Sequence, residues 1–212
     1  MFGDKLNSDK IEFGLDGGIN FSDLQGINEA KYKSNFNLGF YFDFKLKDPA
    51  WMINTGVIVK STMGAKRLPT YPLNDPNLNT SFTGGTITRN LEYFNVPILI
   101  KYQFKNRIFV KAGPQFGLLF KAKDVFLNQI EDKNDLEYTL DVKKQFHPLD
   151  AGFVIGTGYR LTSGNGINLG IHYYQGFVDV YIDDKTPSQF NKSIYLNIGI
   201  PIGVGKSKKN SN

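Results

Sequence analysis

The sequence predicts an all-β fold: an eight-stranded antiparallel up-and-down transmembrane β-barrel with long outer loops and short periplasmic turns. Eight segments show apolar and polar residues in alternation, which is typical of strands because successive side chains point to opposite faces. Most of these segments exceed the usual strand length of about 5–6 residues and suit the roughly 9–11 residues that a tilted strand needs to cross a bilayer. Short and long connections alternate between them, as in outer-membrane barrels.

The hairpin at 93–120 shows this pattern most clearly. Its first strand, YFNVPILIKYQF, places Phe94 and Val96 on an apolar face and polar residues on the other. The turn is expected at 105–107, and a second alternating strand follows at 108–120. The rest of the chain is arranged around this hairpin.

The remaining strands follow in chain order. Alternation predicts strands at 10–20, 35–46, 51–62, 149–161, 167–174 and 194–202. Short turns with breaker residues are expected at 47–50 and 162–166, and long polar loops at 21–33, 63–90, 122–146 and 175–192. Because the number of strands is even, both termini are expected in the periplasm.

Composition narrows the class of protein. The 212 residues suit one outer-membrane β-barrel domain over 1–212, with the barrel at about 10–203 and a polar C-terminal tail at 204–212. There is no cysteine, which excludes disulfides and thiolate metal sites. The net charge of +5 is spread along the chain, so no nucleic-acid partner is predicted. No apolar run approaches the ~20 residues of a membrane helix, and no signal peptide is visible, so we expect the mature chain.

Three features indicate that the polar face of the strands points into the barrel. Glycine falls mostly on that face, which suits the narrow lumen of eight strands. Aromatic residues gather near strand ends on the apolar face, like the two girdles of a barrel in lipid. The polar face carries both signs of charge, which can pair across the lumen. The predicted polar lumen core comprises Glu12, Asp16, Asp43, Lys60, Lys101, Lys111, Asp150, Arg160 and His172. The alternative is a soluble lipocalin-like carrier with its apolar face inside.

Five segments carry patterns that match a known group of barrels. They are GLDGGINFSDL (14–24), YFNVPILIKYQF (93–104), AGPQFGLLFKAK (112–123), DAGFVIGTGYRL (150–161) and HYYQGFVDV (172–180). The first resembles the G-x-x-G-G-x-N-x-S start, and the second the Tyr-x-x-(Ile/Val)-Pro-(Leu/Ile)-Leu-x-Lys-Tyr strand, of the PorT-like outer-membrane β-barrel family of Bacteroidota. The chain departs from that family at its end, GVGKSKKNSN, where an aromatic residue is usual. The resemblance implies an outer-membrane location, no shared catalytic residues and a plausible role in secretion.

His172 is the main candidate for catalysis. It is predicted to face the lumen beside Tyr174 and Tyr195, either as a base like that of lipid A-modifying barrels or as a hydrogen-bonded lumen side chain. Such an enzyme needs a nucleophile within reach of its base, and no His-x-Ser arrangement occurs, so no catalytic residue is predicted. The acidic segment 128–141 lacks the spacing of an EF-hand loop, and we predict no metal and no cofactor.

The long outer loops are the expected partner surface. Apolar residues of 136–142 alternate with polar ones, which suggests a β-ribbon above the membrane whose edges can pair with another chain. The predicted partner surface comprises Tyr71, Phe82, Leu136, Tyr138, Leu140, Phe177 and Tyr181.

We therefore expect a non-enzymatic integral protein of the bacterial outer membrane, acting as an accessory subunit or docking component of a secretion, import or barrel-insertion assembly. Its expected partners are outer-membrane lipids and other outer-membrane or surface proteins. The alternatives are a lipid-modifying outer-membrane enzyme and the soluble carrier.

Overall fold

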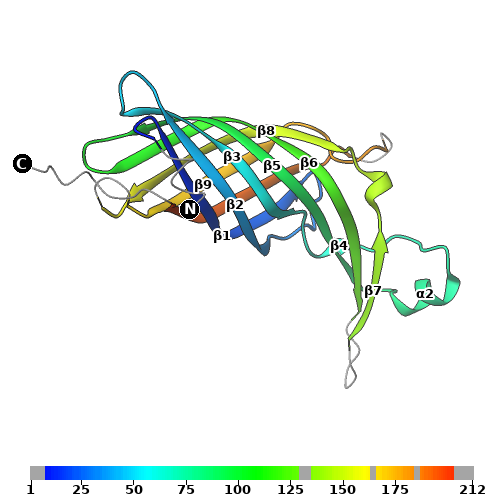
Figure 1. Ribbon diagram of the computed structural model, residues 1–212. Coiled ribbons are helices and arrows are strands. Elements are labelled where there is room, and N and C mark those ends of the chain that lie inside the picture. Colours follow the sequence, from blue (N-terminus) through cyan, green and yellow to red (C-terminus); the bar gives the residue numbers. More distant parts are fainter. Residues whose placement is uncertain (1–7, 129–134, 163–165, 184–186, 203–212) are drawn as a thin grey trace, which may run out of the picture.

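The computed structural model describes residues 8–128, 135–162, 166–183 and 187–202. Its elements are β1 (Ile11–Gln25), β2 (Lys33–Lys45), β3 (Trp51–Met63), β4 (Leu68–Pro69), α2 (Pro76–Ser81), β5 (Thr86–Gln103), β6 (Ile108–Asn128), β7 (Leu136–Asp141), the 3-10 helix η1 (Lys143–Gln145), β8 (Leu149–Arg160), β9 (Asn168–Gly176) and β10 (Phe190–Pro201). These ten strands form one sheet in the order β4-β5-β3-β2-β1-β10-β9-β8-β6-β7, and β5 also pairs with β6. Eight of them therefore close into a barrel, as predicted (Figure 1).

The barrel strands run up and down in chain order, β1-β2-β3-β5-β6-β8-β9-β10. Every neighbouring pair is antiparallel, and β1 closes the ring, since Gly18 lies opposite both Asn37 of β2 and Asn197 of β10. Short turns join β2 to β3, β5 to β6 and β8 to β9 at one end of the barrel, and the long connections lie at the other (Figure 1). Short turns are periplasmic in outer-membrane barrels, so the opposite end is called the outer end below.

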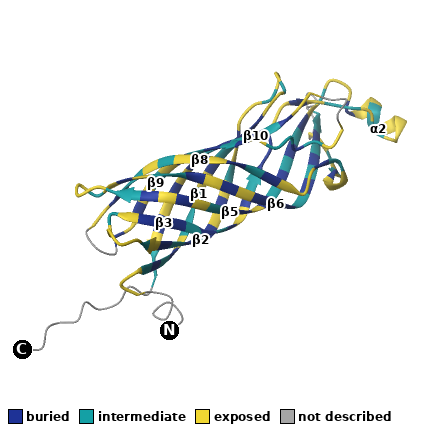
Figure 2. Cartoon of the chain, turned by 90° about the horizontal axis from the view of Figure 1, so that it is seen from above, coloured by how far each residue is buried: buried dark blue, intermediate teal, exposed yellow. Residues whose placement is uncertain are grey.

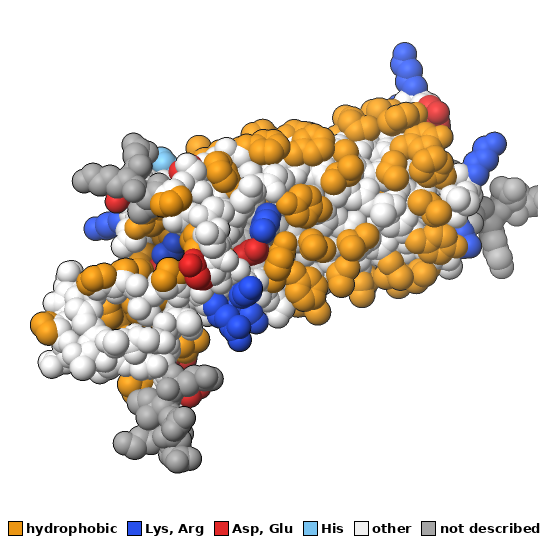
Figure 3. Space-filling view, turned by 180° about the vertical axis from the view of Figure 1, so that it is seen from behind, with side chains coloured by type: hydrophobic (Ala, Val, Ile, Leu, Met, Phe, Trp, Pro, Cys, Tyr) orange, Lys and Arg blue, Asp and Glu red, His pale blue; other side chains and the backbone are white. Residues whose placement is uncertain are grey.

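Apolar side chains cover the outside of the barrel, and polar side chains point inward. On β5, Asn95, Leu99 and Lys101 are buried, whereas Phe94 and Ile98 are exposed. Figure 2 shows buried and exposed positions alternating across the visible strands, and Figure 3 shows apolar side chains forming a broad band over one face. Such a band faces lipid, whereas a soluble carrier would hold its apolar side chains inside.

Two β-bulges interrupt this alternation, one on each side of β5. In β3 the pairing with β5 shifts between Ile58 and Ser61, and in β6 it shifts between Leu119 and Lys121. Each bulge adds one residue, so the strand beyond it presents the opposite set of side chains to the lumen. The prediction that Lys60 faces the lumen is therefore wrong: Lys60 is exposed on the outside of the barrel.

The strands β5 and β6 continue beyond the barrel and form a second, smaller sheet at the outer end. Beyond the end of β3, β4 takes its place and pairs with the first residues of β5. Beyond the residues of β6 that pair with β8, β7 pairs with the last residues of β6. The resulting order β4-β5-β6-β7 defines the outer sheet, which projects past the barrel wall (Figure 1). The predicted β-ribbon is thus a wider structure than two strands, and part of the acidic segment, 129–134, lies outside the described residues.

The helices within the described residues are short. Asp75 precedes α2, and its side chain accepts a hydrogen bond from the N–H of Asn77 at 2.8 Å, while Pro76 occupies the first helical position. None of the helices in the described ranges has the length and apolar character needed to cross a membrane.

Candidate functional site

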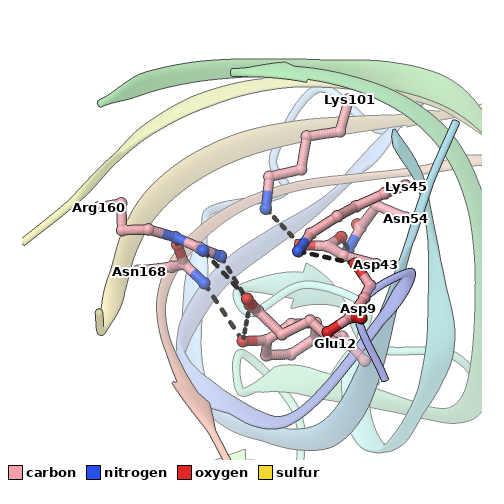
Figure 4. A network of polar contacts seen from close by, with 9 residues as sticks. Asp9, Glu12, Asp43, Lys45, Asn54, Lys101, Arg160 and Asn168 are labelled. Carbon is pink, nitrogen blue, oxygen red and sulfur yellow. Dashed lines mark hydrogen bonds and ion pairs between the residues drawn. The ribbon is translucent and has the colours of Figure 1, made fainter. Parts of the chain in front are cut away.

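The inner half of the lumen, toward the short turns, holds two buried ion pairs. Arg160 of β8 donates to both carboxylate oxygens of Glu12 of β1, at 2.6 and 3.0 Å. Lys101 of β5 lies 2.6 Å from one oxygen of Asp43 of β2, and the other oxygen accepts a hydrogen bond from Asn54 at 2.7 Å. Figure 4 shows both pairs reaching across the lumen from different strands. Each charge has a close opposite charge, which offsets part of its lost hydration.

Neutral polar groups extend this network. The hydroxyl of Tyr41 donates to Glu12 at 3.1 Å and accepts from Asn168 at 3.2 Å. The predicted lumen residues Asp16 and Lys111 line a polar cavity of about 40 Å³ beside it. A cavity of this size has room for only a few water molecules, so side chains occupy most of this layer.

The outer half of the lumen combines buried aromatic rings with buried polar side chains, most of them uncharged. Tyr93, Tyr174 and Tyr195 are all buried in it. The ring of His172 stacks on Tyr195, with ring centroids 4.6 Å apart and 12° between the planes. Asp150 accepts a hydrogen bond from Asn191 at 2.9 Å, and the hydroxyls of Ser61 and Tyr195 share another at 3.0 Å. His172 therefore lies inside the packed lumen, away from the lipid-facing rim where a lipid-modifying base would act.

Aromatic side chains pack together on the inner side of the outer sheet. Phe126 of β6 is completely buried, and the rings of Tyr71, Phe82 and Tyr138 lie around it with centroid distances of 5.1, 5.8 and 6.2 Å. These rings belong to the same cluster of buried residues as the tyrosines of the outer lumen. The outer sheet and the barrel thus share one continuous core.

A buried ion pair lies where the outer sheet meets the barrel. Arg89 of β5 donates to both oxygens of Asp124 of β6, at 2.8 and 2.7 Å. Tyr71 donates to the same carboxylate at 3.1 Å, Gln189 accepts from Arg89 at 3.2 Å, and the ring of Phe146 lies 4.9 Å from the guanidinium carbon. Burial lowers the pKa of the Arg89 guanidinium, but the hydrogen bonds and charge of Asp124 outweigh it and raise that pKa above its ordinary value. One charged pair therefore ties together several outer segments.

Most residues of the predicted partner surface lie in, or pack against, the apolar core that the outer sheet shares with the barrel. Phe82 is 5% exposed, so its prediction as a surface residue is wrong; it packs against Phe126 because the outer segment 64–85 folds back on β6. Leu136 and Phe177 are exposed, at 37% and 66%. The other four are partly buried against the core: Tyr71, Tyr138, Leu140 and Tyr181.

Two hollows of the surface lack the features of a catalytic site. One, of about 410 Å³, lies in the outer sheet and is lined by groups that include Asn79 and Tyr71, whose polar atoms already bond to other protein groups. The other, of about 810 Å³, is lined mainly by lipid-facing side chains such as Ile155 and Ile171. Over the described ranges, no three His, Asp or Glu side chains gather closely enough to hold a metal ion.

The Arg89–Asp124 pair was not anticipated from the sequence, because both residues fell in segments expected to be loops. A signal was nevertheless present. Ile87 and Leu91 continue the alternation of the 93–104 strand outward, with Arg89 at the inward position between them.

The fold, the lipid-facing band and the packed polar lumen define an integral β-barrel protein of the bacterial outer membrane. More particularly, the chain belongs to the outer membrane protein beta-barrel domain family, whose model matches residues 4–181.

Solved structures show similarity to the chain at low identity. The attachment invasion locus protein Ail of Yersinia pestis, in complex with the heparin analogue sucrose octasulfate, is 9% identical with a TM-score of 0.47, over 91% of this chain and 99% of that one. Neisserial surface protein A is 9% identical with a TM-score of 0.42, over 89% and 96%. The N-terminal β-barrel domain of Pseudomonas aeruginosa OprF is 10% identical with a TM-score of 0.27, over 87% and 96%. A comparison with curated proteins gave no match.

Proposed function

We propose that this protein is a non-enzymatic docking component of a larger outer-membrane assembly, and that its outer sheet is the docking element. The observation that carries the proposal is the free edge of β7. This strand is last in the order of the sheet, so its edge away from β6 has no strand partner among the described residues. Unpaired N–H and C=O groups on such an edge can bind an extended segment of another chain.

Exposed side chains near this edge support the same proposal. Glu137 and Thr139 of β7 point to solvent, and Leu136 at its start is an exposed apolar residue. Phe177, on the segment between β9 and β10, offers a second exposed apolar group at the outer end. A partner that adds a strand to β7 would gain main-chain hydrogen bonds and apolar contacts together.

The resemblance to PorT-like barrels makes a secretion assembly the first to test, ahead of import or barrel-insertion assemblies. We further propose that barrel and outer sheet act as one domain, since one buried core runs through both. The position of His172 lends no support to a lipid-modifying enzyme, because its ring is enclosed in the lumen and stacked on Tyr195.

Site-specific photo-crosslinking in living cells tests the docking role. Photoreactive residues replace Glu137 and Thr139, with controls at Asn77 on α2 and Lys47 in a periplasmic turn, all exposed positions. We expect one discrete adduct from both β7 positions, absent from both controls. The adduct from position 137 should be weakened by Thr139→Lys, since a charge on an edge opposes strand addition. No adduct from β7, or equal adducts from all four positions, would contradict the proposal.

A further inference from the structure

The two β-bulges lie at the same height on either side of β5. Tyr93 of β5 pairs with Ser61 of β3 and with Leu119 of β6, and in each neighbouring strand the extra residue sits next to that pairing. Bulges re-aim side chains, and they occur often at the rims of barrels and beside functional sites. The side chains that these two bulges turn outward are therefore candidates for a functional site.

Those side chains are two lysines. Ile58 and Leu119 face the lumen, so uninterrupted alternation would send Lys60 and Lys121, two residues farther along, into the lumen as well. The bulges instead place both ammonium groups on the outer surface, where Lys60 is exposed and the Lys121 side chain is 43% exposed. The backbones of the two lysines lie on the strands that flank β5, about 9–10 Å apart by strand spacing.

The lysines lie where the lipid-facing band ends. Lys60 lies over the ring of Phe36, 5.8 Å from its centroid, and Phe36 is 53% exposed to the outside. On the other side of β5, Phe94 stacks on Phe120 with centroids 4.5 Å apart. Aromatic residues mark the interface of a barrel with the headgroup region. The ammonium groups are therefore at the level of the lipid headgroups of the outer leaflet.

The charges in this region do not cancel. Glu92 of β5 lies between the lysines and pairs with Lys121 at 3.2 Å. Lys60 forms no ion pair with any residue in the described ranges. The Glu92 carboxylate also interacts with the charge of the buried Lys33 of β2. One carboxylate thus has three ammonium groups around it, which leaves a net positive site on the surface that contacts the headgroups.

We propose that Lys60 and Lys121 bind the phosphate groups of a phosphorylated glycolipid of the outer leaflet. A disaccharide headgroup with a phosphate at each end spans a length similar to the separation of the two lysines, while its acyl chains lie along the apolar band below Phe36 and Phe94. Basic groups at this depth attract anionic headgroups. The site is independent of the β7 edge, and it adds a specific lipid to the partners of the protein.

Lipid titration of the purified full chain in nanodiscs tests this site. Binding of bisphosphorylated lipid A, of its dephosphorylated form and of phosphatidylethanolamine is measured by native mass spectrometry. The variants are Lys60→Gln, Lys121→Gln and the double variant, with Lys60→Arg/Lys121→Arg to retain charge and Lys47→Gln in an exposed periplasmic turn as the matched control.

We expect the wild type to prefer the bisphosphorylated lipid. Each single glutamine variant should weaken that binding about fivefold and the double variant about 25-fold, while the arginine variant and Lys47→Gln bind like the wild type. Equal binding of the phosphorylated and dephosphorylated lipids would show that the lysines merely extend toward water at the interface. Equal loss in Lys47→Gln would show a response to net charge alone. Either result overturns the proposal.

Discussion

Replacing Lys101 by Met tests whether the inner lumen behaves as a dry, low-dielectric interior. The substitution removes the ammonium group and keeps most of the volume of the side chain. Asp43, which is completely buried, then keeps the hydrogen bond from Asn54 and the more distant charge of Lys111 as compensation for its own charge. Removing one partner of a buried ion pair destabilises a protein by about 3–5 kcal/mol. Because Asn54 remains, we expect the lower end of that range, about 3 kcal/mol.

The assay is urea unfolding of the barrel in lipid vesicles, followed by the fluorescence of the single tryptophan, Trp51. Trp51 is exposed on the outside of the barrel and contacts Tyr102, with ring centroids 4.8 Å apart, so its emission reports insertion into lipid. The control is Lys47→Met, in an exposed periplasmic turn, which should change the free energy of unfolding by less than about 0.5 kcal/mol.

The double variant Asp43→Asn/Lys101→Met separates loss of charge from loss of packing. It leaves no unpaired charge, so we expect it to be destabilised by only about 1–2 kcal/mol, less than Lys101→Met alone. The reasoning is refuted if Lys101→Met costs less than about 1 kcal/mol, or if the double variant is less stable than the single one. Water in the lumen would then be solvating Asp43.

Three further predictions concern the lumen, the junction with the outer sheet and an outer segment. Gly158→Ala should lower the unfolding free energy by about 1–3 kcal/mol in the same urea assay, because its new methyl group would fall 2.2 Å from an aromatic ring of the lumen. The control is Gly170→Ala at the paired position, where the nearest atom to the new methyl group is 3.6 Å away, so that its effect should be nearly neutral. Arg89→Met leaves the buried carboxylate of Asp124 without its counter-charge, and we expect about 3–5 kcal/mol of destabilisation together with faster proteolysis of the outer sheet; unchanged protease resistance would contradict this. Burial raises the pKa of Asp179, but hydrogen bonds from two backbone N–H groups outweigh it and hold that pKa below its ordinary value of about 3.9. The Asp179 carboxylate therefore stabilises its segment fully above about pH 3.9, and this stabilisation is lost as the pH falls through the lowered pKa. In NMR spectra the two amide signals should shift during this titration, and Asp179→Asn should abolish the shift.

The strands of the barrel could be predicted from the sequence because their alternation depends only on which face meets lipid. The strand expected at 51–62 is observed at Trp51–Met63. Lys60 could not be placed, since the bulge beside it falls in an apolar run, Val57–Val59, where a change of face leaves no mark in the pattern. A bulge is a property of the pairing between strands rather than of one strand.

The outer sheet shows the same limit. If the predicted hairpin were extended without a bulge, Arg89 would lie opposite Lys123; the extra residue at Phe120 shifts the pairing and brings Asp124 there instead. The alternation at 136–142 did indicate a strand, observed as Leu136–Asp141. Phe82, which packs against this strand, comes from a distant segment of the chain. The alternation within the strand therefore could not show that Phe82 is a core residue and not a surface residue.

The shared core of barrel and outer sheet has a mechanical consequence. Buried side chains run without a break from Val154 and Tyr174 inside the membrane-embedded wall to Phe126 in the outer sheet. Force applied at β7 would therefore be transmitted into a closed cylinder of hydrogen-bonded strands rather than absorbed by a tether. If a partner segment pairs with β7 as proposed, it would meet a pre-organised template, and little conformational entropy of the barrel would be lost on binding. The packed lumen would in this way set the rigidity of the outer sheet.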